Sequence, residues 1–343
     1  MLKVGVVVVV LWAMGRHVAA LTTEWSEQEK SLHDLSLNSG WIGVALVTFL
    51  GSQLCFSMFW ARLLKGCGAD VSPMKALRAY GVGTLGKYVP GKALVVLLRT
   101  RLLRDASISR LSVGLTVVYE TLTMMAVGGA VASVCLLIAQ PDEWPFWSGA
   151  AAGSCGLTAC LHPVLFGRLA KLASLPFKGA SDDFSAKACW AGFLRWGALP
   201  IGGWGLLGAS FWGVAQAMGI PCSSADDFLF LTGTAAMATA VGFLVLFMPA
   251  GLGVRELVII HLLAPRYGVS EVVLASLLLR TIWTLGEGLL GGALWSGPAL
   301  LARLDRTATR GRKSASTVTR DADAQFHNVP DGHQDSVEDA ARC

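Results

Sequence analysis

Charge is the scarcest property of this sequence of 343 residues, because Asp, Glu, Lys and Arg make up only 15% of it. Soluble domains usually carry roughly 25% charged residues. Hydrophobic residues account for 54% of the chain, and the mean hydropathy is +0.57. This composition argues against an ordinary soluble domain and predicts an integral membrane protein. The sequence also lacks a basic surface interleaved with aromatic residues, so we expect no nucleic-acid partner.

Metal-binding and redox motifs are missing as well. The eight cysteines are dispersed, and no two of them form a C-x-x-C pair. The six histidines are scattered, and no H-E-x-x-H motif occurs. We interpret the cysteines as small apolar side chains and expect neither a metal site nor a cofactor.

Long apolar runs are what the sequence has instead. A helix that spans a bilayer needs about 20 mostly apolar residues. The runs predict an all-α integral membrane protein of about seven or eight transmembrane helices. The candidate spans are 2–21, 41–60, 111–139, 146–166, 190–216, 228–248 and 271–297. Close helix packing is expected at the small-residue pairs Gly128–Gly129, Gly202–Gly203 and Gly291–Gly292.

The N-terminal run resembles a signal peptide, because it combines Lys3, an apolar stretch and a small-residue "VAA". Arg16 and His17 interrupt the region between the apolar stretch and the cleavage position. We therefore prefer an uncleaved first membrane segment.

Charge alternates between the loops. Residues 61–110 hold ten basic residues against two acidic ones, and loop 167–188 is basic too. The loops 22–38, 140–145 and 219–227 are mainly acidic. The positive-inside rule places the basic loops in the cytoplasm.

The C-terminal residues 304–343 are polar, and we expect them to form a disordered cytoplasmic tail after a membrane domain at 1–303. Seven spans that begin in the cytoplasm would place this tail outside. Two alternatives remove the conflict: either 249–264 crosses the membrane together with its neighbour, or the first segment does not cross.

A Pro-Gly pair interrupts the apolar run "LGKYVPGKALVVLLR" at 85–99. Pro90 lacks a backbone N–H and disfavours helix at the residue before it, and Gly91 permits close backbone approach. A short helix that starts at this break is expected to dip into the membrane. Broken backbone at membrane depth is tolerated only beside protein or a water-filled cavity, so the break predicts a cavity.

Basic residues surround this break. A helix N-terminus attracts anions, and Lys87, Lys92 and Arg99 would add positive charge there. We predict a phosphate or head-group site from Lys87, Pro90, Gly91, Lys92 and Arg99. The alternative is that these cations only determine membrane topology.

A second break occurs in "FMPAGLGVRELVIIHLL" at 247–263, where Pro249, Gly251 and Gly253 precede Arg255 and Glu256. A charge in the membrane centre costs at least about 2.5 kcal/mol, so Arg255 requires a partner or a function. Adjacent helix residues point apart, which disfavours Glu256 as that partner.

Glu120 and Glu287 are better candidates for pairing with Arg255. Arg280 and Glu287 share one helix face. The predicted cavity and charge-pairing residues are Glu120, Pro249, Gly251, Gly253, Arg255, Glu256, Arg280 and Glu287. Purely structural ion pairs are the alternative.

The two breaks also form a weak internal repeat. In each copy, a break at Pro and Gly is followed by a short helix and then by a long helix that carries a glutamate.

These motifs resemble the lysylphosphatidylglycerol synthase transmembrane-region family, the flippase half of the bacterial multiple peptide resistance factor. The resemblance rests on "LGKYVPGKALVVLLR", "YE" at 119–120, "MPAGLGVRE" at 248–256 and "LLRTIWTLGEG" at 278–288, and it covers about residues 1–300. It implies a multi-pass protein of the bacterial inner membrane. Without a soluble acyltransferase-like domain, it implies a flippase-like architecture and not aminoacyl transfer.

We therefore expect the protein to bind and translocate an anionic lipid or lipid-linked head group. Its lipid partner is expected to be a phospholipid or a polyprenyl-phosphate-linked glycan. Ala250 and Lys92 depart from the family pattern and leave both lipids open. The sequence has no P-loop, so movement would be passive or ion-driven, with protonation of Glu120 or Glu287 as one coupling step.

Two other functions are alternatives. The first is a lipid-modifying transferase, whose tight acidic pair Asp226–Asp227 is interpreted better as a capped helix start on the outer side. We do not expect an enzyme for this reason. The second is a non-transporting membrane partner of a glycosyltransferase or synthase.

Overall fold

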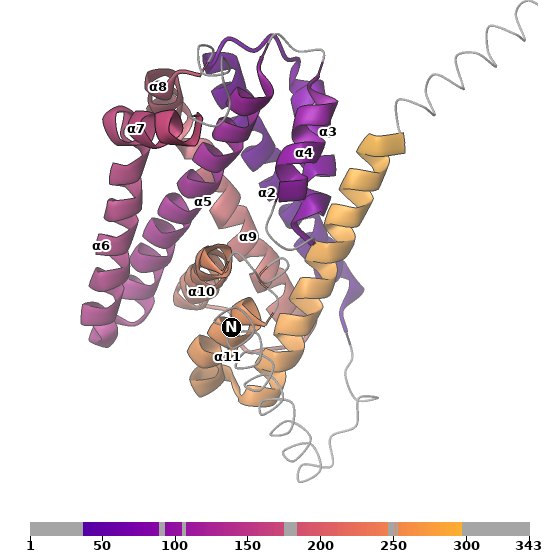
Figure 1. Ribbon diagram of the computed structural model, residues 1–343. Helices are drawn as coiled ribbons and strands as arrows, with labels where there is room; N and C mark the ends of the chain where they lie inside the picture. Colours follow the sequence, from indigo (N-terminus) through magenta and orange to yellow (C-terminus); the bar gives the residue numbers. More distant parts are fainter. Residues whose placement is uncertain are drawn as a thin grey trace, which may run out of the picture. The chain divides into compact units, whose positions relative to one another are not determined.

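The computed structural model describes residues 37–88, 93–104, 108–174, 184–245, 251 and 253–296. Helices and their connections make up all of these residues, and no strand occurs among them (Figure 1). The described residues as far as Leu294 group into one unit. The prediction of an all-α protein is therefore confirmed. The first predicted span at 2–21 and the tail at 304–343 lie outside the described residues.

Five described helices are long and apolar enough to cross a membrane. They are α2 (Ser39–Gly66), α5 (Arg110–Ala139), α9 (Ala198–Ala217), α10 (Ala225–Leu244) and the last described helix, Val269–Ser296. A sixth crossing results if α6 (Trp144–Leu161) and α7 (Pro163–Ser174) count as one bent span. Each predicted span from 41–60 onward coincides with one of these helices, so the chain is a multi-pass membrane protein.

Two predicted spans are divided in the structure. The span 146–166 bends by 67° between α6 and α7. His162 has extended backbone angles there (φ −57°, ψ 138°), because the ring of Pro163 disfavours helix at the residue before it. The span 190–216 splits at Gly197 into α8 (Ala186–Trp196) and α9. Pro200 lacks the N–H that would continue the helix across this joint.

Three shorter α-helices and one 3₁₀ turn flank the residues where the sequence predicts the two breaks. The helix α3 (Pro73–Thr84) continues into the 3₁₀ turn η2 (Leu85–Tyr88), and α4 (Ala93–Leu102) follows and packs against α3. In the same way α11 (Val254–Tyr267) packs against α10. We call α3 with α4 the first hairpin and α10 with α11 the second. The break residues 89–92 and 246–250, with the predicted Pro90, Gly91, Lys92 and Pro249, lie outside the described residues.

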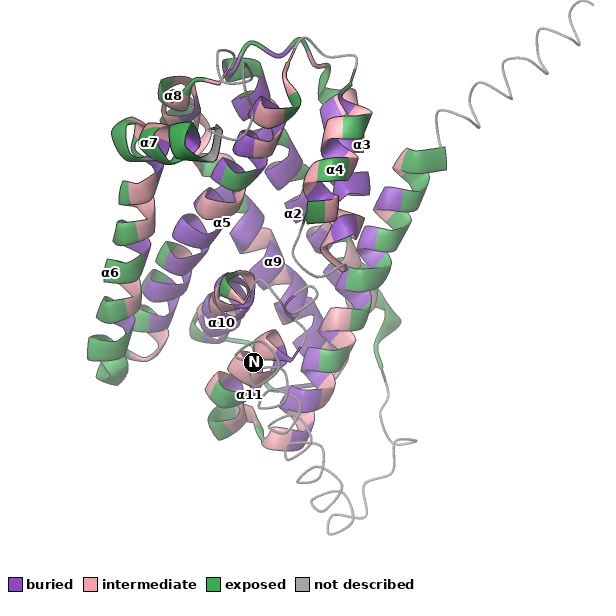
Figure 2. Ribbon diagram, viewed as in Figure 1, coloured by how far each residue is buried: buried purple, intermediate pink, exposed green. Residues whose placement is uncertain are grey.

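Burial differs sharply between the helices. Buried residues fill most of α10, whereas α6 buries only Trp147, Ser154 and Leu161. Figure 2 shows this contrast as a largely purple α10 and a mostly green α6. Large apolar side chains such as Trp144 and Phe146 are exposed on α6 or at its start. The exposed surface of α6 therefore suits contact with lipid chains, and α10 lies in the core.

Glycines allow several helices to approach closely. A Cβ at Gly128, Gly129, Gly203 or Gly291 would lie within 2.7 Å of a neighbouring side-chain atom, while nothing lies within 4 Å of one at Gly202 or Gly292. The predicted close packing is thus confirmed for both residues of the first pair and for one residue of each other pair. Lipid chains are as apolar as the helix surfaces, so the hydrophobic effect does not drive these helices together. Small residues let the helices approach closely, and van der Waals packing then stabilises the contact.

Gly208 provides a test of this packing. A Cβ at Gly208 of α9 would lie 2.0 Å from Thr232 Oγ1 of α10, whereas nothing lies within 4 Å of one at Gly205. We expect Gly208→Ala to cost about 1–3 kcal/mol of unfolding free energy through overpacking. Gly205→Ala, on the same helix, should be neutral or slightly stabilising. Thermal unfolding of both purified variants in detergent measures the difference, and equal behaviour of the two would contradict the α9–α10 contact.

Candidate functional site

A cavity of about 110 Å³ lies among both hairpins and the long helices around them. One water molecule needs about 10–15 Å³ of such space, so the cavity can hold a small polar group together with water. Its lining combines aromatic and apolar side chains with five charged residues, which are Lys87, Arg99, Glu120, Arg255 and Glu287. A second cavity of about 30 Å³ shares Lys87, Arg255 and Glu287 with it and adds Glu256 and Arg280.

The predicted charges therefore meet although they come from distant parts of the chain. Lys87 lies on η2 and Arg99 on α4, in the first hairpin. Glu120 comes from the middle of α5, and Arg255 and Glu256 open α11. All of the described residues that the sequence predicted as charged site residues line one of the two cavities.

The first ion pair joins Arg99 and Glu120. Arg99 Nη1 donates to Glu120 Oε2 over 2.7 Å, and both side chains are buried. The guanidinium also lies over the rings of Trp60 and Tyr80, at 4.5 and 4.3 Å from their centroids. Removing either charge would leave the other buried without a partner, so the pair fixes the first hairpin against α5.

The second ion pair joins Lys87 and Glu287, which are two hundred residues apart. Tyr88 supports it, because its hydroxyl donates to Glu287 Oε2 over 2.9 Å and lies 3.3 Å from Thr284 Oγ1. Lys87 keeps 18% of its side chain exposed, whereas Glu287 keeps 4%. The first hairpin is thus also held to the last described helix.

The third ion pair joins Glu256 and Arg280. Arg280 Nη1 donates to Glu256 Oε1 over 2.5 Å, and the Gly253 N–H donates to Glu256 Oε2 over 2.7 Å. The backbone of Gly251 and Gly253 is left-handed (φ +67° and +82°), a conformation that other residues rarely adopt. These glycines allow the turn that brings the Gly253 N–H back to the carboxylate of Glu256.

Arg255 remains without an ion pair among the described residues. Its guanidinium lies 5.5 Å from the ring centroid of Phe243, and its Nε atom is buried without a hydrogen-bond partner. The sequence predicted Glu120 or Glu287 as its partner. The structure instead pairs these carboxylates with Arg99 and Lys87, which the first hairpin places against α5 and the last described helix.

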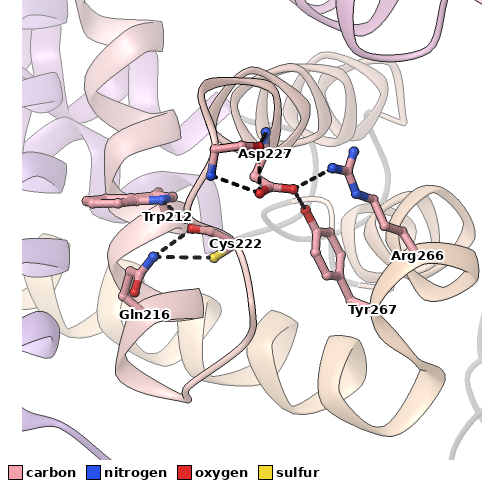
Figure 3. A network of polar contacts seen from close by, with 7 residues as sticks. Trp212, Gln216, Cys222, Asp227, Arg266 and Tyr267 are labelled. Atoms are coloured by element: carbon pink, nitrogen blue, oxygen red, sulfur yellow. Dashed lines mark hydrogen bonds and ion pairs between the residues drawn. The ribbon is translucent and has the colours of Figure 1, made fainter.

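A separate polar network ties the two ends of the second hairpin together (Figure 3). Asp227, at the start of α10, accepts from the hydroxyl of Tyr267 and pairs with Arg266, both over 2.6 Å. Its other oxygen accepts from the Ser224 N–H and hydroxyl, while Ser224 Oγ accepts from the Asp227 N–H. The interpretation of this segment as a capped helix start is confirmed. Asp227 is occupied with structural contacts.

Polar contacts continue into the loop before α10. Trp212 Nε1 and Gln216 Nε2 both donate to the carbonyl of Cys222, over 3.0 and 2.7 Å (Figure 3). The loop is therefore attached to α9 as well as to the second hairpin.

Several residues around the cavity were not predicted. Tyr80 and Trp60 face Arg99, and Tyr88 contacts Glu287. Tyr88 stands next to Lys87 in the "GKY" motif, so the motif itself carried a signal. No sequence pattern marked Trp60 and Tyr80 as site residues, because aromatic residues are common in membrane helices.

The sequence matches the family model described as the lysylphosphatidylglycerol synthase TM region over residues 1–291. No curated protein matches the chain. Among the described residues, no group of three or more His, Cys, Asp or Glu is placed to hold a metal ion. The family match confirms the resemblance that the motifs predicted.

The Arg99–Glu120 pair gives one prediction. Glu120→Ala should cost about 3–5 kcal/mol of unfolding free energy, because Arg99 would stay buried and uncompensated. The double variant Arg99→Met/Glu120→Leu should cost clearly less, because it buries no charge. Thermal or denaturant unfolding in detergent compares the two, and a double variant as unstable as the single one would contradict this account.

The Asp227 network gives another. Asp227→Ala should cost about 1–3 kcal/mol, because it removes a helix cap and leaves the Tyr267 hydroxyl unpaired. The exposed neighbour Asp226 is the matched control, and Asp226→Ala should cost under about 1 kcal/mol. Unfolding of both variants is the measurement. Equal losses would mean that Asp227 does not hold the hairpin ends together.

Proposed function

The chain belongs to the family of the lysylphosphatidylglycerol synthase TM region, and from this premise we propose that it binds an anionic lipid head group in the central cavity and translocates it. The family makes the function of this membrane protein lipid-related. The translocation step is our proposal, and the geometry of the two hairpins and the charges between them supports it.

The two hairpins are proposed to enter the membrane from opposite sides. α3, α4 and α11 have 12, 10 and 14 residues, lengths of roughly 18, 15 and 21 Å, which fall short of a bilayer core of about 30 Å. α10 has 20 residues and is long enough to cross, so only its partner α11 is a half-helix in the second hairpin. The first hairpin follows the basic end of α2, and the second follows the acidic loop 219–227. By the positive-inside rule the first would be cytoplasmic and the second external. The predicted broken half-helices and the total of seven or eight spans, which includes 2–21, belong to this proposal.

A repeated packing detail supports the relationship between the hairpins. Arg99 lies on the second helix of the first hairpin, and its stem packs on Gly83 of α3. Arg255 has the same place in the second hairpin and packs on Gly242 of α10. A Cβ at either glycine would lie 2.5 or 2.9 Å from the arginine Cγ. Paired broken helices that bring charge to a central site are a recurring design of membrane transporters.

The observation that carries the proposal is the uncompensated Arg255. Arg255 is partly buried, its Nε atom is fully buried, and it has no ion pair among the described residues. A guanidinium without a partner is costly inside a membrane protein, and its natural ligands are carboxylate and phosphate. Both carboxylates of the larger cavity already have cationic partners. A phosphate from a lipid head group would satisfy Arg255, with Lys87 close by in the same cavities.

Location, lipid and energy source complete the proposal. We place the protein in the bacterial inner membrane with its C-terminal tail in the cytoplasm, as the basic loops favour. The lipid would be a phospholipid or a polyprenyl-phosphate-linked glycan. Movement would be passive or coupled to protonation of Glu120 or Glu287.

The test is transbilayer movement of a labelled lipid. Full-length protein is reconstituted into vesicles that carry fluorescent phosphatidylglycerol, and the accessible label is quenched from outside. Arg255→Gln should lower the protein-dependent rate at least about tenfold, because a hydrogen bond to a charged group contributes about 1.5–3 kcal/mol. Arg168→Gln, an exposed arginine on α7, is the matched control and should move lipid at the wild-type rate.

Other outcomes separate the alternatives. If neither Glu120→Gln nor Glu287→Gln alters the rate or its pH dependence, proton coupling is excluded. If the wild type moves no lipid and co-purifies in fixed ratio with a glycosyltransferase or synthase, the non-transporting role replaces translocation.

A further inference from the structure

The charges in the cavity do not balance. Among the described lining residues of the larger cavity, three cations face two carboxylates. The smaller cavity adds Glu256 and Arg280, which neutralise each other. Among the described lining residues, the cations therefore outnumber the carboxylates by one.

The excess has a defined position. Arg99 is paired with Glu120, and Lys87 is paired with Glu287, so the unbalanced charge is that of Arg255. Arg255 lines both cavities and has no ion pair among the described residues, although the Nε atoms of both Arg99 and Arg255 are buried without a partner. One singly charged anion bound at Arg255 would bring the net charge of the described lining residues of the two cavities to zero.

The carboxylates are not free to receive a cation. Glu120 is held by Arg99, Glu287 by Lys87 and Tyr88, and Glu256 by Arg280 and the Gly253 N–H. An ammonium group that took Glu287 would leave Lys87 without its partner, in the same cavities as Arg255, which has no ion pair among the described residues. Removing one partner of a buried ion pair costs about 3–5 kcal/mol, so a cationic head group is disfavoured here.

From this imbalance, and resting on the proposed function, we infer that the site selects a lipid with a singly charged phosphodiester and rejects aminoacylated, cationic lipids. The phosphodiester oxygens accept from the Arg255 guanidinium, in the two-pronged geometry that arginine and phosphate share. The aromatic lining, which includes Phe49, Phe56 and Trp283, suits the apolar part next to the phosphate. Phosphatidylglycerol and a polyprenyl-phosphate-linked sugar both carry this chemistry.

The selection follows from the chain's own residues and departs from the lipid in the family's name. Lysylphosphatidylglycerol carries two ammonium groups and one phosphodiester, so its net charge is positive. Its phosphate would suit Arg255, but no free carboxylate among the described cavity residues would receive its ammonium groups.

The experiment compares head groups in one assay with full-length protein in vesicles. Four fluorescent lipids are used: phosphatidylglycerol, phosphatidylcholine, lysylphosphatidylglycerol and a short polyprenyl-phosphate sugar. Wild type should move one of the two anionic lipids at least about tenfold faster than the cationic one. A tenfold difference in rate is the effect expected from gaining or losing one hydrogen bond to a charged group. The faster anionic lipid identifies which source of phosphodiester the protein uses.

Charge reversal makes the test specific. Arg255→Glu removes the excess cation and adds a carboxylate, so the preference should move at least about tenfold toward lysylphosphatidylglycerol. Arg255→Gln should abolish the preference, and Arg168→Gln should retain it. Native mass spectrometry of the same variants with mixed lipids measures retention independently of movement and shows whether each variant is folded.

The outcomes separate the two proposals. Equal rates for all four lipids, or faster movement of lysylphosphatidylglycerol by the wild type, would overturn the selection and leave translocation standing. Movement of no lipid, combined with selective retention of an anionic lipid that Arg255→Glu loses, would overturn translocation and support the selection. Neither movement nor selective retention would overturn both.

Discussion

The cost of burying charge in a membrane protein is the constraint on which the rest of this structure depends. A guanidinium or carboxylate at membrane depth must be paired, hydrated or bound to a ligand. Glu120, Glu256 and Glu287 each meet a cation that comes from a different helix. Because each pair crosses a helix boundary, the pairs position the two hairpins as well as neutralise their charges.

The glycines of the hairpins serve the same constraint. Gly83 and Gly242 give room to the stems of Arg99 and Arg255, so that each guanidinium can lie beside its hairpin without displacing backbone. Gly251 and Gly253 adopt left-handed conformations that let the backbone turn toward Glu256. Backbone freedom at these positions is thus what allows buried charge to be held at all.

The sequence predicted the features that local chemistry determines. Apolar length identified the spans from 41–60 onward, and Gly251 and Gly253 identified the left-handed turn before α11. The scarcity of charge made Glu120, Arg255, Arg280 and Glu287 conspicuous. The bend after Leu161 and the joint at Gly197 were missed, because a window of hydropathy averages across a single Pro or Gly.

The choice of ion-pair partners could not be predicted in this way. Lys87 and Glu287 are two hundred residues apart, and either could have paired with Arg255, Arg280 or Glu120 by charge alone. Only the packing of the first hairpin against the last described helix decides the pairing. The contacts of Trp60 and Tyr80 with Arg99 could not be predicted from the sequence either, because they depend on how α2, α3 and α4 pack together.

The two hairpins are alike in plan and unlike in charge state. In the first, the arginine has the glutamate of the following long helix as its partner, Arg99 with Glu120. In the second, the corresponding glutamate, Glu287, is paired with Lys87 of the first hairpin, and Arg255 is left over. One carboxylate cannot neutralise two cations, and Glu287 is paired with Lys87, so the anion that we propose at Arg255 would supply the missing negative charge. If that anion binds, it would lie in the same cavities as the Lys87–Glu287 pair, which attaches the first hairpin to the last described helix. Binding at Arg255 would then affect how the first hairpin is held.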